Sequence, residues 1–171
     1  MACNNQEFAR ARVDAVVSER ALREIYLKGF EYAVKAGSAC AVMTAYNPVN
    51  GFHAASNYDL TTTLLREEWG FDGIVMTDWW ATMNDPVRGG EASRHNTAAM
   101  VRAQNDLYMV IGNNGAEVNA GEDNTLAALA SGTLTINAHS VVDPRRALPT
   151  DCEARRRLAG YWNWNIAGLF Y

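Results

Sequence analysis

The chain has 171 residues, which is enough to bury the core of one ordinary domain. Its formal net charge of -4 at pH 7 gives no electrostatic reason to expect nucleic acid or an anionic membrane as a partner. Hydrophobic residues make up 49% of the chain and charged residues 20%, as in folded globular proteins and unlike disordered ones.

We expect no membrane span and no metal-binding motif, and the sequence leaves the compartment open. Its first seven residues have neither a basic nor an apolar region, so no signal peptide is expected. No apolar run approaches the ~20 residues that a membrane-spanning helix needs. Cys3, Cys40 and Cys152 are too scattered for a disulfide framework or a zinc ribbon, and we expect them to be small buried hydrophobic residues. The histidines have no second ligand at metal-binding spacing, so no metal and no other cofactor is expected.

A first amphipathic helix is expected from Glu19 to Gly37, with Ser18 as its N-cap. Apolar residues recur at three- and four-residue spacing and predict one buried face. They are Leu22, Ile25, Tyr26, Phe30, Ala33 and Val34. Two pairs of opposite charge have a favourable i,i+4 spacing on the other face: Glu19 with Arg23, and Glu24 with Lys28.

Two short apolar runs are expected to form buried parallel strands. The first covers residues 39–46 and is followed by a turn-rich loop over 47–51. A helix over about 59–69 ends at Gly70, which has the position of a left-handed helix stop. The second strand covers residues 73–78, and its continuous apolar run is typical of a strand covered on both faces.

The later part of the chain continues this alternation. The remaining elements are expected in this order: a loop over 81–93, a helix over 98–104, a strand over 106–111, a loose loop over 112–121, a helix over 126–130 stopped by Gly132, and helices near 138–148 and 152–158. The aromatic tail over 161–171 is expected to pack against another surface, and the alternative is that it binds a ligand. Strands and helices in this order predict right-handed βαβ units and a parallel sheet. A closed barrel of eight such units takes ~250 residues, so the prediction is an α/β fold, a single domain over 1–171 that forms about half of a TIM-like barrel.

Asp78 lies where the second strand ends, and Trp79 and Trp80 follow it. The carboxyl ends of parallel strands form the edge where α/β proteins place their chemistry. A carboxylate at that edge, beside aromatic side chains, suits a site that faces a sugar. The alternative is that Asp78 only caps a following helix.

Residues 39–80 resemble the nucleophile region of glycoside hydrolase family 3, the family of β-glucosidases and β-xylosidases. Three blocks carry the resemblance: Val42-Met43-Thr44-Ala45-Tyr46-Asn47 with Val49-Asn50-Gly51; Leu64-Leu65-Arg66 with Trp69-Gly70-Phe71-Asp72-Gly73; and Val75-Met76-Thr77-Asp78-Trp79. Their joint occurrence at this spacing is specific, whereas a lone Asp-Trp pair would not be. The resemblance implies that the chain is the C-terminal half of the family's catalytic barrel.

The resemblance also implies a function and a set of site residues. Asp78 would be the nucleophile of a retaining β-glycosidase that releases terminal β-D-glucosyl or related residues through a covalent glycosyl-aspartate. Tyr46 would lie near this nucleophile, and Met43 and Trp79 would line the sugar pocket. Retaining glycosidases need an ionised carboxylate and a protonated acid ~5–5.5 Å apart. The alternatives are that Tyr46 and Trp79 are core aromatics and that Met43 fills the core.

Parts of the family pattern are missing from this sequence. The family's sugar-binding Lys-His pair would precede Met1, and many members take their general acid from a following sandwich domain. Gln104 stands where the family usually has glycine, and Val110-Ile111 stand where it has Pro-Gly. A second hypothesis is therefore a non-catalytic truncated fragment or interaction piece. The expected partners are a carbohydrate and, for a half-barrel, a complementing barrel half or a second copy of the chain.

Overall fold

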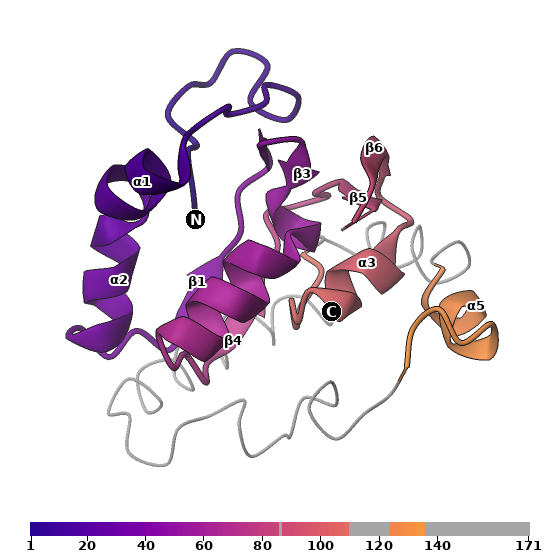
Figure 1. Cartoon of the computed structure of the whole chain (residues 1–171). Helices are drawn as coiled ribbons and strands as arrows, with labels where there is room; N and C mark the ends of the chain where they lie inside the picture. Colours follow the sequence, from indigo (N-terminus) through magenta and orange to yellow (C-terminus); the bar gives the residue numbers. More distant parts are fainter. Residues whose placement is uncertain (86, 110–123, 136–171) are drawn as a thin grey trace, which may run out of the picture.

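The computed structural model describes residues 1–85, 87–109 and 124–135 (Figure 1). Its elements follow in this order: α1 (Glu19–Ala21), η1 (Leu22–Tyr26), α2 (Lys28–Lys35), β1 (Ala41–Met43), β2 (Pro48–Val49), β3 (Phe52–His53), η2 (Ala54–Ser56), η3 (Asp59–Glu68), β4 (Ile74–Met76), β5 (Met83–Asp85), β6 (Gly89–Ser93), α3 (Thr97–Arg102) and α5 (Thr125–Ala130). The predicted elements over 112–121, 138–148, 152–158 and 161–171 lie outside the described residues.

The centre of the fold is the parallel pair of β1 and β4, in which Val42 lies opposite Val75. Residues 107–109 run parallel along the other edge of β4. The amide of Leu107 donates to the Val75 carbonyl at 3.1 Å, and the amide of Thr77 donates to the Leu107 carbonyl at 2.9 Å. The predicted parallel pairing is therefore confirmed for β1 and β4, whereas Leu107 joins β4 through an isolated parallel bridge and not as a full strand. The barrel itself remains a prediction.

The helical region before β1 begins where the sequence predicts and ends two residues earlier, at Lys35. The Ser18 hydroxyl accepts a hydrogen bond from the amide of Ala21 at 3.2 Å, which confirms the N-cap. The middle turn, η1, is a π-helix, whose i→i+5 bonds widen the helix by one residue.

One of the two predicted ion pairs on this helix is confirmed and the other is wrong. Arg23 binds Glu19 at 2.9 Å as predicted. Glu24 instead binds Arg20 at 3.1 Å, and Lys28 binds Glu31 at 2.8 Å. The predicted Glu24–Lys28 pair does not form because each partner has a competing neighbour of opposite charge.

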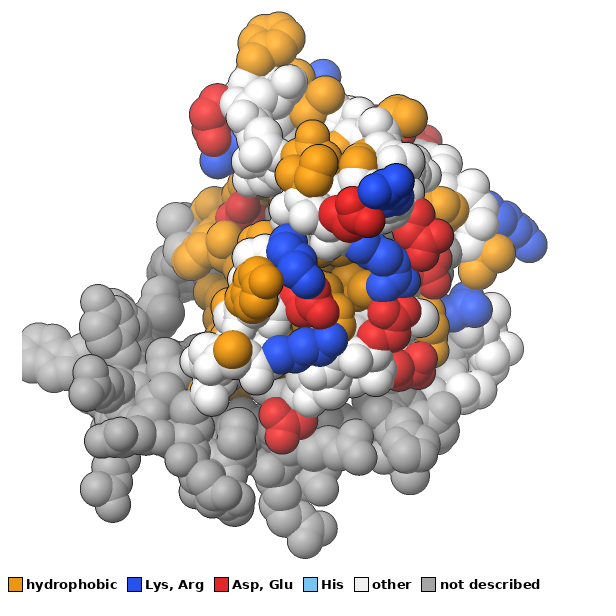
Figure 2. All heavy atoms as spheres, turned by 60° about the vertical axis from the view of Figure 1, so that its left-hand side comes forward, with side chains coloured by type: hydrophobic (Ala, Val, Ile, Leu, Met, Phe, Trp, Pro, Cys, Tyr) orange, Lys and Arg blue, Asp and Glu red, His pale blue; other side chains and the backbone are white. Residues whose placement is uncertain are grey.

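The predicted apolar face of this helix is buried only in part. Leu22 and Val34 pack against the core, and Leu27, between η1 and α2, is fully buried. Ile25 is 68% exposed and Phe30 is 37% exposed, so the prediction that the whole face is buried is wrong. Figure 2 brings the side with α1 and α2 forward and shows hydrophobic side chains among alternating acidic and basic ones.

Helix η3 covers the parallel strands and supplies much of the core. Leu60, Leu64 and Leu65 are at most 4% exposed and cluster with Val42 and Val75. Burial of each such side chain stabilises the fold by roughly 1.5–3 kcal/mol. The helix ends before Gly70, whose φ of +71° confirms the predicted left-handed stop.

Two β-hairpins occupy stretches that the sequence predicts as loops. β2 and β3 pair antiparallel around Asn50 and Gly51, whose φ values of +51° and +86° suit a two-residue hairpin turn. β5 and β6 pair antiparallel after Asp78. The prediction of an unstructured loop over 81–93 is therefore wrong.

The remaining described elements agree with the sequence. α3 and α5 begin one residue earlier than predicted, and Gly132 ends the latter with a φ of +74°. Cys3 and Cys40 are half-buried thiols outside any disulfide. Within the described ranges, no helix combines the length and the apolar character that crossing a membrane requires.

Candidate active site

Asp78 is half-buried and stands two residues beyond the carboxyl end of β4. Its Oδ1 accepts a hydrogen bond from the main-chain amide of Trp79 at 2.9 Å. The Thr77 hydroxyl before it accepts from the amide of Met109 at 2.9 Å, and the amide of Trp80 donates to the Met109 carbonyl at 2.9 Å. The main chain on both sides of Asp78 is thus bound to the neighbouring strand, which gives the carboxylate a fixed position.

Tyr46 is half-buried in the loop that follows β1, the neighbour of β4. Burial raises the pKa of its phenol, and the charge of Asp78 and a hydrogen bond to it raise the pKa further. The guanidinium of Arg10 lies 4.9 Å from the centre of the Tyr46 ring, and Arg10 and Arg94 partly offset the rise. Tyr46 therefore remains a neutral phenol beside Asp78, where it can donate a proton to the carboxylate in a hydrogen bond.

Met43 and Trp79 occupy the same ends of the two strands. Met43 closes β1 and is 40% exposed. Trp79 is half-buried, and its indole nitrogen is buried with no hydrogen-bond partner among the described residues. A buried indole N–H without a partner is uncommon in a protein core, because desolvating it costs free energy.

A second catalytic acid is not evident in the part of the chain that the structure describes. Glu67 and Glu68 both lie on η3, and Glu68 is bound to Arg23 at 2.6 Å on the outer surface. Glu91 is exposed on β6. Among the described residues there is also no group of three or more potential metal ligands.

Several residues around this strand edge have no signal in the sequence that points to the site. Arg10 comes from an irregular segment, more than thirty residues before Tyr46 in the sequence. His53 ends β3, Thr82 lies just before β5, and the His53 Nδ1 is 3.2 Å from the Thr82 hydroxyl. Sequence spacing cannot find such contacts, because only the folding of the chain brings the two residues together.

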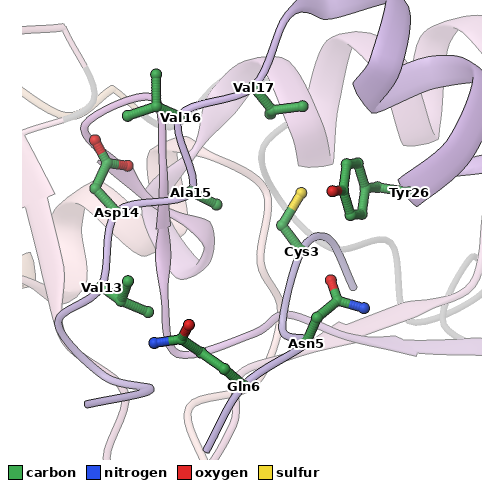
Figure 3. Close-up of a pocket in the computed structure, with 9 residues that line it drawn as sticks. All are labelled: Cys3, Asn5, Gln6, Val13, Asp14, Ala15, Val16, Val17 and Tyr26. Carbon is green, nitrogen blue, oxygen red and sulfur yellow. The ribbon is translucent and has the colours of Figure 1, made fainter. Parts of the chain in front are cut away.

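A cavity of about 290 Å³ lies elsewhere, between the N-terminal segment and η1 (Figure 3). Nine residues line it: Cys3, Asn5, Gln6, Val13, Asp14, Ala15, Val16, Val17 and Tyr26. None of the four predicted site residues is among them. The strand edge at Asp78 is therefore the candidate site on chemical grounds, because it combines a fixed carboxylate, a phenol and a half-buried indole.

Known proteins resemble the chain over most of its length. Residues 10–141 match the glycosyl hydrolase family 3 N terminal domain. A β-glucosidase from Ruminococcus albus is 58% identical over 132 residues, which are 77% of this chain and 13% of that protein. An exo-α-(1→6)-L-arabinopyranosidase from Bifidobacterium longum is 58% identical over 80 residues, 47% of this chain and 11% of that protein. The crystal structure of a β-glucosidase from Paenibacillus barengoltzii matches with a TM-score of 0.76 and 68% identity, over 85% of this chain and 15% of that one.

Proposed function

The chain belongs to glycosyl hydrolase family 3, and on that premise we propose that it carries the nucleophile of a retaining β-glycosidase, Asp78. The observation that carries the proposal is the fixed carboxylate at the end of β4, with the neutral phenol of Tyr46 beside it. In the reaction, Asp78 attacks the anomeric carbon, and the leaving oxygen takes a proton from an acid. Water then releases the sugar from the glycosyl-aspartate.

Each remaining site residue has a separate role in this proposal. The Tyr46 phenol hydrogen-bonds the carboxylate and keeps the reactive oxygen directed at the sugar. Trp79 and Met43 offer apolar surface to the C–H face of the sugar ring.

The proposed substrate is a terminal, non-reducing β-D-glucosyl residue. Its support is that the relatives over most of this chain are β-glucosidases. The arabinopyranosidase match, equally identical over a shorter stretch, names a competing sugar. Parallel assays on aryl β-D-glucopyranoside and aryl α-L-arabinopyranoside separate the two.

The chain spans 13% and 15% of the length of the two β-glucosidases. We therefore place its described strands in the second half of a family 3 barrel, with the general acid on a part of the enzyme outside this chain. The parallel order of β1, β4 and residues 107–109 is the order that consecutive strands of a barrel have, and it supports the barrel without indicating which half of it the chain forms.

The test uses a chimera in which this chain replaces the matching segment of the Paenibacillus barengoltzii β-glucosidase. Asp78→Asn should lower turnover by at least about 10³-fold, as loss of a covalent nucleophile does in other enzymes. The matched control is Asp72→Asn, because Asp72 is exposed in the turn before β4. A 2-fluoroglucoside should label Asp78 in the parent chimera. Labelling of another carboxylate, or equal turnover of Asp78→Asn and Asp72→Asn, would contradict the assignment.

A further inference from the structure

We propose that His53 is a positioning residue that fastens the Tyr46 loop to the loop after Asp78 and so holds the phenol against the carboxylate. Any effect of His53 on catalysis rests on the function proposed above. The contacts of His53 and the experiment below do not rest on that function, because they concern only how Tyr46 is held beside Asp78.

The His53 ring bridges the two loops through a single nitrogen. Its Nδ1 lies 3.2 Å from the carbonyl oxygen of Tyr46 and 3.2 Å from the hydroxyl oxygen of Thr82. A carbonyl oxygen can only accept, so the contact with Tyr46 requires a proton on Nδ1. The Thr82 hydroxyl then accepts from the same N–H, so the two contacts share one proton in a bifurcated hydrogen bond. Burial lowers the pKa of His53, which favours the neutral ring with this proton on Nδ1 and none on Nε2.

The two contacts connect the ends of neighbouring strands. Tyr46 follows β1 by three residues, and Thr82 follows Asp78 by four. β1 and β4 are paired over three residues each, and the last main-chain bond between them runs from the amide of Thr44 to the Met76 carbonyl at 2.8 Å. The His53 ring provides a cross-link beyond that bond, where Tyr46 and Asp78 meet.

The main chain of His53 is itself held rigidly. Its amide donates to the Oδ1 of Asn84 at 2.9 Å, and the Nδ2 of Asn84 donates to the Gly51 carbonyl at 2.7 Å. Asn84 is 1% exposed, so these bonds form in a desolvated environment and tie the β2–β3 hairpin to the β5–β6 hairpin. A ring on this support can fix the Tyr46 loop rather than follow its motion.

The phenol pKa of Tyr46 reports on its distance from Asp78, because charged groups near Tyr46 shift it. Asp14 is the charge that acts on His53. On Tyr46, Asp78 raises the phenol pKa, and Arg10 and Arg94 lower it. Loss of the cross-link would let the phenol move away from Asp78, and its pKa would then fall toward the ordinary value.

The experiment is a ¹³C NMR titration of the tyrosine side chains in the full chain. The chain has seven tyrosines, and the Tyr46 signal is identified by its loss in Tyr46→Phe. Asp78→Asn measures how much of the raised pKa depends on the carboxylate. His53→Leu removes the donor and keeps the bulk, whereas His53→Asn places an amide N–H near the position of Nδ1. Tyr32, which is 63% exposed, is the internal control.

His53→Leu should lower the Tyr46 pKa by at least half as much as Asp78→Asn does. His53→Asn should keep the Tyr46 pKa of the parent chain, and the Tyr32 signal should be the same in both variants. A parent-like Tyr46 pKa in His53→Leu overturns the proposal. Should His53→Leu not fold, His53→Gln takes its place, because the glutamine amide lies beyond the position of Nδ1. A parent-like Tyr46 pKa in His53→Gln would also overturn the proposal. Failure of Asp78 as nucleophile would appear in the chimera assay and would leave this titration unaffected.

Discussion

Arg66 and Asp106 form an ion pair of 2.8 Å in which the two side chains are only 17% and 12% exposed. The same Asp106 oxygen accepts a hydrogen bond from the amide of Val75 at 2.7 Å. Arg66 also donates to the carbonyls of Gln104 at 3.0 Å and Gly73 at 3.2 Å. The pair therefore joins η3, the start of β4 and the strand at 107–109, at the opposite end of β4 from Asp78.

The first prediction is that the largely buried Arg66–Asp106 pair contributes more to folding stability than the exposed Arg23–Glu68 pair. Arg66→Met should lower the free energy of unfolding by about 3–5 kcal/mol, because it leaves a largely buried carboxylate without its counter-charge. The matched control is Arg23→Met, which breaks the pair with Glu68. Both of those side chains are 41% exposed, and the loss should stay below about 1 kcal/mol. Urea unfolding of the full chain measures both, and equal losses would contradict the prediction.

The second prediction concerns the contribution of Glu31 to folding stability as the pH falls. Lys28, and then Lys35, lower the pKa of Glu31 to about 2 from an ordinary 4.5. The unfolded chain therefore binds this proton first as the pH falls, so Glu31 contributes stability above about pH 4.5 that is lost on approach to pH 2. The parent chain should be more stable than Glu31→Gln at neutral pH, and the difference should vanish in strong acid. Urea midpoints over a pH series test this.

The contribution of Asp106 to folding stability should change with pH in the opposite direction, measured in the same series of urea midpoints. Burial raises its pKa more than the Val75 amide and Arg66 lower it. The folded state then holds the proton more tightly than the unfolded state, so this group's contribution is full below its ordinary pKa and declines as the pH rises. The stability of the parent relative to Asp106→Asn should therefore increase on acidification. Parallel slopes for the Glu31 and Asp106 variants would refute the assignment of opposite shifts.

The third prediction compares two glycines. A Cβ on Gly73 would overlap the Cys40 carbonyl, which accepts the first hydrogen bond between β1 and β4, and would lie 2.7 Å from the Phe71 ring. Gly73→Ala should cost about 1–3 kcal/mol or more, because main chain must move. On Gly29, in α2, a Cβ meets nothing within 4 Å, so Gly29→Ala should stabilise by up to about 1 kcal/mol. Thermal unfolding of the two variants should give shifts of opposite sign.

Local signals in the sequence were sufficient for the elements that are determined locally. The Ser18 cap, the stop at Gly70 and the parallel order of β1, β4 and residues 107–109 follow from propensity, turn chemistry and apolar runs. The position of Asp78 at a strand end follows from the same run. The cap and the helix stop depend on neighbours in sequence, and the parallel order follows from the general rule that consecutive βαβ strands lie side by side.

Features that depend on distant partners could not be predicted in this way. The hairpin after Asp78 is held by Asn84, which contacts Gly51 and His53 more than thirty residues away. Arg66 lies inside a recognised sequence block, yet its contacts with Gln104 and Asp106 appear only in the fold. The exposure of Ile25 and Phe30 could not be predicted for the same reason, since periodicity predicts an apolar helix face but not what covers it.

The fourth prediction separates the roles of Trp79 and Tyr46 in the chimera. Trp79→Ala removes stacking area and should raise KM by roughly 2- to 10-fold, the equivalent of ~0.5–1.5 kcal/mol. Tyr46→Phe removes one hydrogen bond to the nucleophile, so it should lower kcat with a smaller change in KM. Steady-state kinetics on an aryl β-glucoside give both values. Negligible effects of both changes would indicate that the two aromatics only pack.

The last prediction is that the isolated 171-residue chain self-associates and barely hydrolyses an aryl β-glucoside. On η1 and α2, Ile25 and Tyr32 are 68% and 63% exposed. Exposed apolar side chains favour association, and the strand pair has no further described partner beside β1 to close the sheet. Ile25→Glu should reduce association in sedimentation velocity. Leu126→Glu, on α5, changes a side chain that is 79% exposed and should have no such effect. A sharp monomer with turnover that Asp78→Asn abolishes would contradict the prediction and would mean that the chain supplies its own acid.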